Sequence, residues 1–159
     1  MRVGFGLGSN LGDKLDNINN AIAMLEQRGV AKLKIISRVY RTPPWGVLDQ
    51  GDFANACAIG ETVLSPYELL AAVKKIEADM GRAPTRRWGP RLIDIDILFL
   101  GDETLDDPEL TLPHKELFGR GFVLAPLVEI APDLILDGVA VRDALAAVDV
   151  SGVRLWNEG

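Results

Sequence analysis

The sequence predicts an α+β protein in which one antiparallel sheet carries helices on one side. Runs rich in apolar and β-branched residues mark strands at 2–8, 32–41 and 53–63 and within 87–101. Apolar residues at helical spacing mark one helix after the first strand and another after the third. The order strand, helix, strand, strand, helix, strand is that of a ferredoxin-like βαββαβ sandwich, here followed by added C-terminal elements.

The first strand, RVGFGLG, leads into a helix whose apolar face is formed by Leu15, Ile18, Ile22 and Leu25 and which Gly29 is expected to end. The glycines of GLGSNLGD between them resemble the start of a dinucleotide-binding fold. Repeated βαβ units are missing, however. A tight turn in which Asn10 or Asp13 serves the start of the helix is therefore the preferred interpretation.

The segment 32–41 reads as one strand and runs into the Pro/Gly-rich loop TPPWGVLDQGD. In the strand 53–63, larger side chains alternate with alanines, so one face carries Phe53, Asn55, Cys57 and Ile59. Ser65 to Glu68 form a capping box that opens a helix ending at Gly81, with an apolar face of Leu69, Val73, Ile76 and Met80. Further helices are expected near 122–130 and 141–148.

The composition is that of one domain, residues 1–159, with 48% hydrophobic and 25% charged residues. The net charge of −6 argues against nucleic acid or an anionic membrane as a partner. No segment reads as a secretory peptide or a membrane span, which predicts a cytoplasmic protein, expected to act as a monomer. The single cysteine, Cys57, lies in an apolar run and is expected to be a buried thiol rather than a nucleophile.

Two aspartates interrupt the last predicted strand, RWGPRLIDIDILFLG. Asp94 and Asp96 should share a face with Leu98 and Leu100, roughly 6.6 Å apart along the strand, opposite Ile93, Ile95, Ile97 and Phe99. Like charges so close on a half-buried strand are costly unless a cation meets them. Charges that keep an edge strand from aggregating are the alternative interpretation.

Four arginines stand just before the aspartates: Arg82, Arg86, Arg87 and Arg91. With Trp88 among them, they could contact single-stranded nucleic acid or simply form a solvated loop. Beside two carboxylates, a third interpretation gains weight, in which Mg²⁺ binds the carboxylates and a polyphosphate while arginines bind the remaining phosphate oxygens. By default, the single histidine, His114, is a surface or capping residue, Glu77 an exposed helix charge, and Phe53 and Phe122 are core residues.

Several motifs together resemble the family of 6-hydroxymethyl-7,8-dihydropterin pyrophosphokinases (HPPK). They are Thr42-Pro43-Pro44-x-Gly46 with Phe53-x-Asn55, Arg87-Trp88-Gly89-Pro90-Arg91-x-x-Asp94-x-Asp96, Leu112-Pro113-His114 and Arg120-Gly121-Phe122. The resemblance runs from Gly8-Ser9-Asn10 to Glu129-Ile130-Ala131-Pro132. It implies transfer of a pyrophosphoryl group from ATP, the co-substrate, to the hydroxymethyl oxygen of the pterin, with release of AMP.

The resemblance also implies the site. Asp94 and Asp96 would bind two Mg²⁺ ions, and the catalytic residues would be Arg82, Arg91 and Asp96, the last as a candidate proton acceptor. ATP would be bound by Glu77, Arg82, Arg87, Trp88, Arg91, Ile97, Thr111, His114 and Arg120. The pterin would be bound by Thr42, Pro44, Trp45, Gly46, Phe53, Asn55, Trp88 and Phe122. A non-catalytic ferredoxin-like module that binds a small ligand is the second hypothesis, and RNA binding through the sheet is the third.

Overall fold

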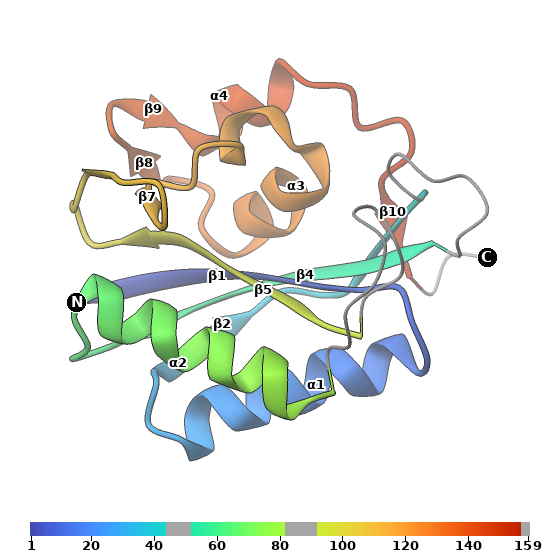
Figure 1. Cartoon of the computed structure of the whole chain (residues 1–159). Helices are drawn as coiled ribbons and strands as arrows, with labels where there is room; N and C mark the ends of the chain where they lie inside the picture. Colours follow the sequence, from blue (N-terminus) through green and yellow to red (C-terminus); the bar gives the residue numbers. More distant parts are fainter. Residues whose placement is uncertain (44–51, 82–91, 157–159) are drawn as a thin grey trace.

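The computed structural model describes residues 1–43, 52–81 and 92–156. In this part of the chain the main sheet has six antiparallel strands, in the order β10-β3-β4-β1-β5, with β2 also paired to β4 (Figure 1). The strands are β1 (Arg2–Ser9), β2 (Lys32–Ile36), β3 (Tyr40–Thr42), β4 (Phe53–Glu61), β5 (Asp94–Leu100) and β10 (Arg154–Leu155). The predicted α+β class and antiparallel ferredoxin-like sheet are confirmed.

Two helices, α1 (Lys14–Gln27) and α2 (Pro66–Asp79), pack side by side on one face of the sheet (Figure 1). The Asp13 side chain caps α1 by accepting from the Asp16 backbone N–H. At the start of α2, Ser65 and Glu68 form the predicted capping box. Each cap satisfies backbone N–H groups that have no partner within the helix, and so fixes where the helix begins.

C-terminal elements lie over the opposite face of the sheet (Figure 1). They are β6 (Leu105–Asp106), β7 (Thr111–Leu112), the 3-10 helix η1 (Leu117–Gly119), α3 (Gly121–Ile130), β8 (Ile135–Leu136), β9 (Val139–Ala140) and α4 (Val141–Ala146). The βαββαβ unit has its helices on one side as expected, but α3 and its neighbours cover part of the face expected to be open. Among the described residues, the helices are all too short or too polar to cross a lipid bilayer.

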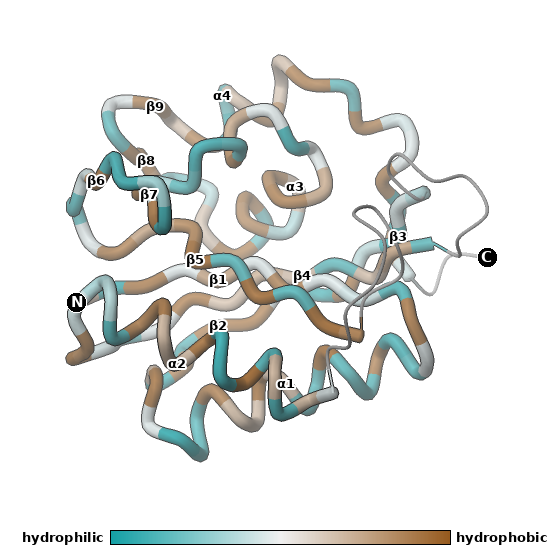
Figure 2. The backbone as a smooth tube through the Cα atoms, in the orientation of Figure 1, coloured by the Kyte–Doolittle hydropathy of each residue, from teal (hydrophilic) through white to brown (hydrophobic). Residues whose placement is uncertain are grey.

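The sheet separates two apolar cores. Val3, Phe5 and Leu7 of β1 face α1 and α2, whereas Cys57 and Ile59 of β4 belong to the core beneath α3. Hydrophobic residues accordingly concentrate in the central strands and in α3 (Figure 2). Cys57 is buried, as predicted, and burial raises the pKa of its thiol, which therefore stays protonated.

The predicted single strand 32–41 is wrong, because β2 and β3 are separate strands. Ile36 pairs with Ala58 and Tyr40 with Asn55, so the outer chain takes four steps where β4 takes three. At the break, the Ser37 hydroxyl accepts from the backbone N–H of Cys57. A side-chain oxygen thus replaces a strand carbonyl and lets the chain bulge away from β4.

The predicted faces at the end of the aspartate strand are also wrong. Gly4 of β1 pairs with Phe99, but the next residue, Phe5, pairs with Ile97, which leaves Leu98 as an extra residue in β5. This bulge reverses the alternation. Phe99 packs in the core beneath α3, and Leu100 in the core beside α1 and α2.

Candidate functional site

Strand register brings the aspartates and Asn55 to one face of the sheet. Gly8 of β1 lies opposite Asn55 on one side and Asp94 on the other, and Gly6 lies between Cys57 and Asp96. We call this the site face; it is opposite the face covered by α1 and α2. Because β1 contributes only glycines here, no side chain of β1 separates the β4 residues from the half-buried aspartates.

Three predicted pterin-binding residues lie together at the ends of β3 and β4. Thr42 pairs with Phe53 in the sheet, and the Asn55 side-chain amide donates a 2.9 Å hydrogen bond to the Thr42 hydroxyl. Thr42 and Asn55 are buried, so this bond holds the carboxamide in one orientation. Phe122, the fourth, stands at the start of α3, which packs on β4.

His114 is held against the aspartate strand by its backbone and its ring. Its backbone N–H donates to the Leu98 carbonyl of β5, and its Nδ1 accepts from the Glu116 backbone N–H. The Nε2 atom consequently points toward Asp96, 3.9 Å from Oδ1. Burial lowers the pKa of the imidazole below its ordinary value, while the nearby Asp96 carboxylate acts in the opposite direction. His114 is thus half-buried, and its ring caps the following turn, which agrees with the capping alternative of the default interpretation.

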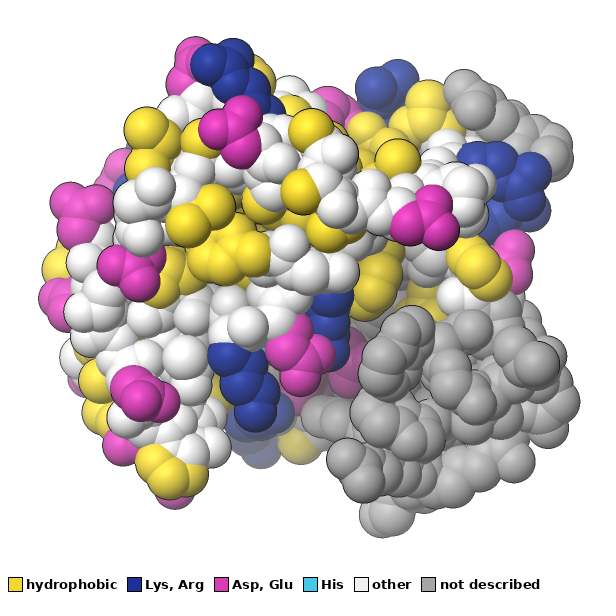
Figure 3. Space-filling view, turned by 90° about the horizontal axis from the view of Figure 1, so that it is seen from above, with side chains coloured by type: hydrophobic (Ala, Val, Ile, Leu, Met, Phe, Trp, Pro, Cys, Tyr) yellow, Lys and Arg dark blue, Asp and Glu magenta, His cyan; other side chains and the backbone are white. Residues whose placement is uncertain are grey.

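A cavity of about 170 Å³ runs along the outer edge of β5. Three predicted ATP-binding residues and Asp96 line it together with residues of α2 and of the segment after β6: Leu70, Val73, Lys74, Ile95, Asp96, Ile97, Pro108, Glu109, Leu110, Thr111, His114 and Lys115. The Ile97 side chain is buried in the core beside α1 and α2, so the strand backbone is what Ile97 can offer a ligand. In the view from above, acidic and basic side chains lie next to one another near the centre of the picture (Figure 3).

Glu77 is not the exposed helix charge of the default interpretation. It is 3% exposed, and its Oε2 accepts a 2.8 Å hydrogen bond from the backbone N–H of Ile95. Its other oxygen lies 3.6 Å from Nζ of Lys74. Glu77 thereby occupies a backbone donor on the edge of β5, next to the cavity.

Arg120 contacts both the turn after His114 and the aromatic ring of Phe122. Its guanidinium donates to the Glu116 carboxylate and sits 5.6 Å from the centre of the Phe122 ring. A cation over an aromatic ring favours a fixed orientation of both. Arg120 thus ties the turn that carries His114 to the start of α3.

The remaining predicted site residues lie outside the described residues: Pro44, Trp45, Gly46, Arg82, Arg87, Trp88 and Arg91. Two features of the described site were not predicted from the sequence. One is the glycine face of β1, which the alternation of glycine with Val3, Phe5 and Leu7 could have indicated. The other is a bond from the Tyr40 hydroxyl to Glu129 of α3, for which residues so far apart in the chain give no signal.

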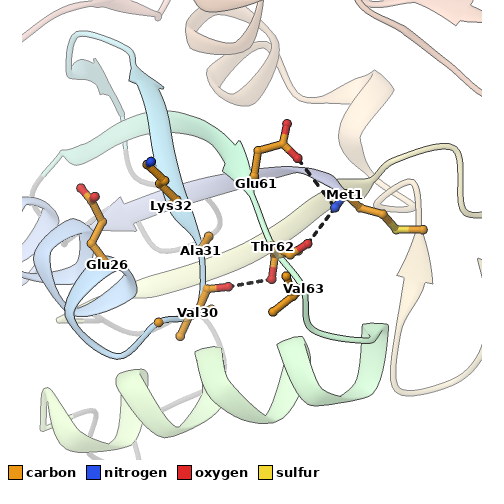
Figure 4. A pocket seen from close by; sticks show the side chains of 9 residues that line it. Met1, Glu26, Val30, Ala31, Lys32, Glu61, Thr62 and Val63 are labelled. Carbon is orange, nitrogen blue, oxygen red and sulfur yellow. Dashed lines mark hydrogen bonds and ion pairs between the residues drawn. The ribbon is translucent and has the colours of Figure 1, made fainter.

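A separate cavity lies at the opposite end of β1 (Figure 4). The N-terminal ammonium donates to the Thr62 carbonyl there, and the Thr62 hydroxyl donates to the Val30 carbonyl. Its lining residues are Met1, Glu26, Gly29, Val30, Ala31, Lys32, Glu61, Thr62 and Val63, none of which belongs to the predicted site. Arg2 pairs with Glu61 at the start of β1, beside this cavity, whereas Gly8 pairs with Asn55 near its end. The cavity and the site face are therefore well separated along β1.

Comparison with known proteins identifies the family. The family model for 7,8-dihydro-6-hydroxymethylpterin-pyrophosphokinase (HPPK) matches residues 4–132. The chain belongs to the HPPK family. One HPPK relative, the 2-amino-4-hydroxy-6-hydroxymethyldihydropteridine pyrophosphokinase of Methylorubrum extorquens, is 47% identical over 153 residues, covering 96% of this chain and 97% of the relative. The enzyme of the same name from Pseudomonas aeruginosa is 41% identical over 154 residues, covering 96% and 95%.

Solved structures show the HPPK fold at greater evolutionary distance. A crystal structure of an HPPK-DHPS in complex with substrates superposes with a TM-score of 0.75 at 15% identity and covers 92% of this chain. This chain spans 43% of that longer protein. At such low identity the likeness concerns the fold alone, and it agrees with the antiparallel sheet described above.

Proposed function

We propose that this HPPK, a pyrophosphokinase of folate biosynthesis, transfers the pyrophosphoryl group from ATP to the hydroxymethyl oxygen of the dihydropterin on the site face. The observation that carries the proposal is the row Asn55, Gly8, Asp94 across three neighbouring strands. On one side of Gly8, which has no side chain, this row places the Asn55 carboxamide, which can donate and accept hydrogen bonds. On the other side it places the Asp94 carboxylate. A flat ring with a polar edge and a hydroxymethyl arm needs both.

The pterin is held by its edge and its faces in this proposal. The Asn55 carboxamide offers both a donor and an acceptor, which suits the amide and amino groups of a pterin. Phe53 on β4 and Phe122 on α3 supply aromatic faces for stacking. Pro44, Trp45, Gly46 and Trp88 complete this pocket by family resemblance.

The residues present fit Mg²⁺. Within the described ranges, no three His, Cys, Asp or Glu side chains are grouped to hold a metal ion. Mg²⁺, however, is commonly bound by one or two carboxylates together with substrate phosphates. Asp94 and Asp96 supply this ligand type, and two bound Mg²⁺ ions would neutralise charge on the phosphates during transfer. Asp96 is also the proposed acceptor of the hydroxyl proton.

ATP is proposed to lie along the edge of β5. The cavity there brings the backbone of Ile97 together with Thr111 and His114, and it opens beside Asp96. Because Nδ1 of the half-buried imidazole accepts from the Glu116 backbone N–H, Nε2 can donate to a phosphate oxygen. Glu77 and Arg120 lie beside these residues, and the resemblance adds Arg87 and Trp88 to the ATP-binding set and Arg82 and Arg91 as cations at the transferred group.

The products distinguish this reaction from the alternatives. The protein is incubated with ATP, Mg²⁺ and 6-hydroxymethyl-7,8-dihydropterin, and the nucleotides are separated by chromatography. We expect AMP and pterin diphosphate in equal amounts, both lost when a chelator removes the metal. ADP would show transfer of a single phosphoryl group, and ligand binding without AMP would show a non-catalytic module; either result would contradict the proposal.

A further inference from the structure

The site face of β1 consists of glycines at alternate positions. Gly4, Gly6 and Gly8 point to this face, whereas the residues between them are buried against α1 and α2. Neighbouring strands lie about 4.8 Å apart, so Asn55 on β4 and Asp94 on β5 stand about 9.6 Å from one another across Gly8. A two-ring heterocycle with a one-carbon arm is of comparable length.

The three glycines differ in what a side chain would meet. A Cβ on Gly4 would fall 2.2 Å from the Phe99 ring, so Gly4 is required by packing. A Cβ on Gly6 would lie 3.3 Å from a terminal methyl of Leu98, which can move. On Gly8 it would lie 3.3 Å from Oδ1 of Asn55.

The Asn55 side chain cannot easily move away from a Cβ at position 8. Its Nδ2 donates to the Thr42 hydroxyl at 2.9 Å, and both residues are buried. The bond directs Nδ2 toward β3 and leaves Oδ1 on the side of Gly8. Among the described residues other than its chain neighbours, the other atom within 4 Å of a Cβ at position 8 is the Ala54 carbonyl oxygen, so no described side chain of β5 comes that close.

We infer that Gly8 is a specificity-determining residue for the acceptor substrate. Because Gly8 has no side chain, the Asn55 carboxamide keeps the orientation in which it can hydrogen-bond to the polar edge of the pterin. The strip between Asn55 and Asp94 also stays open for a flat ring. This inference rests on the proposed function. It concerns the pterin alone, because the proposed ATP cavity lies on the other side of Asp96, along the edge of β5.

The test is Gly8→Ala, with Gly6→Ala as the matched control on the same strand and face. We expect Gly8→Ala to raise the KM and the dissociation constant for the dihydropterin by about tenfold or more, the size of effect that one misplaced group in a binding pocket has. The dissociation constant for ATP should stay within about twofold of the wild-type value. Gly6→Ala, whose Cβ would meet the movable Leu98 methyl instead of Asn55, should weaken pterin binding less than Gly8→Ala does.

A double variant separates a local effect from a general loss of structure. In an Asn55→Ala background the crowded oxygen is absent, so Gly8→Ala should weaken pterin binding less than it does in the wild type. Unchanged pterin constants in Gly8→Ala, or equal weakening of ATP and pterin binding, would overturn the inference. Neither result touches the proposed function, which fails only if the wild-type enzyme forms no AMP.

Discussion

Asp94 and Asp96 are the residues on which the proposed chemistry depends most directly. Replacing either by asparagine keeps its size but removes the charge that a divalent cation needs. We expect Asp94→Asn and Asp96→Asn each to lower kcat by at least about a hundredfold. AMP formation measures the loss, and circular dichroism of Asp96→Asn should match that of the wild type because Asp96 is half-buried on the sheet surface.

Asp102→Asn is the matched control for both variants. Asp102 is exposed in the turn after β5, outside the proposed site. Its activity should equal that of the wild type. Turnover near the wild-type rate in Asp94→Asn or Asp96→Asn would show that the carboxylates are not needed.

Glu77 has a structural role that can be measured apart from catalysis. Glu77→Ala leaves the Ile95 backbone N–H without its acceptor and should lower the free energy of unfolding by about 1–3 kcal/mol. Glu77→Gln keeps an oxygen in place and should lose less. Urea unfolding compares the two variants, and equal losses would show that the hydrogen bond to Ile95 is not what stabilises this edge.

At the scale of the elements, local signals in the sequence were sufficient for the helices α1 to α4 and for the strands β1, β4 and β5, but not for the short strands β6 to β10. Capping residues such as Asp13 and Ser65 act on the next few residues, so their effect can be predicted without a fold. The two errors within the main strands, at Ser37 and at Leu98, are both places where one strand carries an extra residue relative to its partner. Register depends on the partner strand, and the pattern of a single strand does not contain it.

The site was predictable to a similar degree. Alternation correctly put Asp94 and Asp96 on one face, and Phe53 and Asn55 on one face of another strand. That these faces coincide depends on β1 lying between β4 and β5, and that His114 reaches Asp96 depends on a hydrogen bond between its backbone and Leu98. The resemblance to the family predicted that these residues belong to one site. The alternation of residues along single strands did not.

The contact between β3 and α3 should make stability depend on pH. The Tyr40 hydroxyl donates to Glu129, and burial, together with this bond, raises the pKa of Tyr40 to about 12. The folded state therefore favours protonated Tyr40, and its contribution is complete below pH 10, the ordinary pKa, and is lost as the pH rises toward 12.

Tyr40→Phe lacks the hydroxyl and should be less stable than the wild type by roughly 0.5–1.5 kcal/mol at pH 8. Above pH 10 the difference between the two proteins should shrink. Urea unfolding at pH 8 and pH 11 measures both values. A difference that is the same at the two pH values would show that ionisation of Tyr40 is not linked to folding.

Considered as a whole molecule, the protein brings two ligands to one sheet from different directions. The proposed ATP cavity follows the edge of β5, whereas the proposed pterin residues lie at β3, β4 and the start of α3. The two meet over Asp94 and Asp96. Because the chain carries a net charge of −6, the approach of a polyphosphate is unfavourable unless cations offset it.

Binding of ATP should therefore stabilise the fold far more with Mg²⁺ than without it. At a concentration one hundred times the dissociation constant, a ligand that binds only the folded state adds about 2.7 kcal/mol. For a chain of 159 residues this corresponds to a rise in Tm of about 5–11 °C. The measurement is thermal unfolding with ATP and Mg²⁺, compared with ATP and a chelator at the same concentrations. In Asp94→Asn/Asp96→Asn the Mg²⁺-dependent part of the rise should disappear, and a full rise in that variant would place the metal-dependent binding of ATP elsewhere in the molecule.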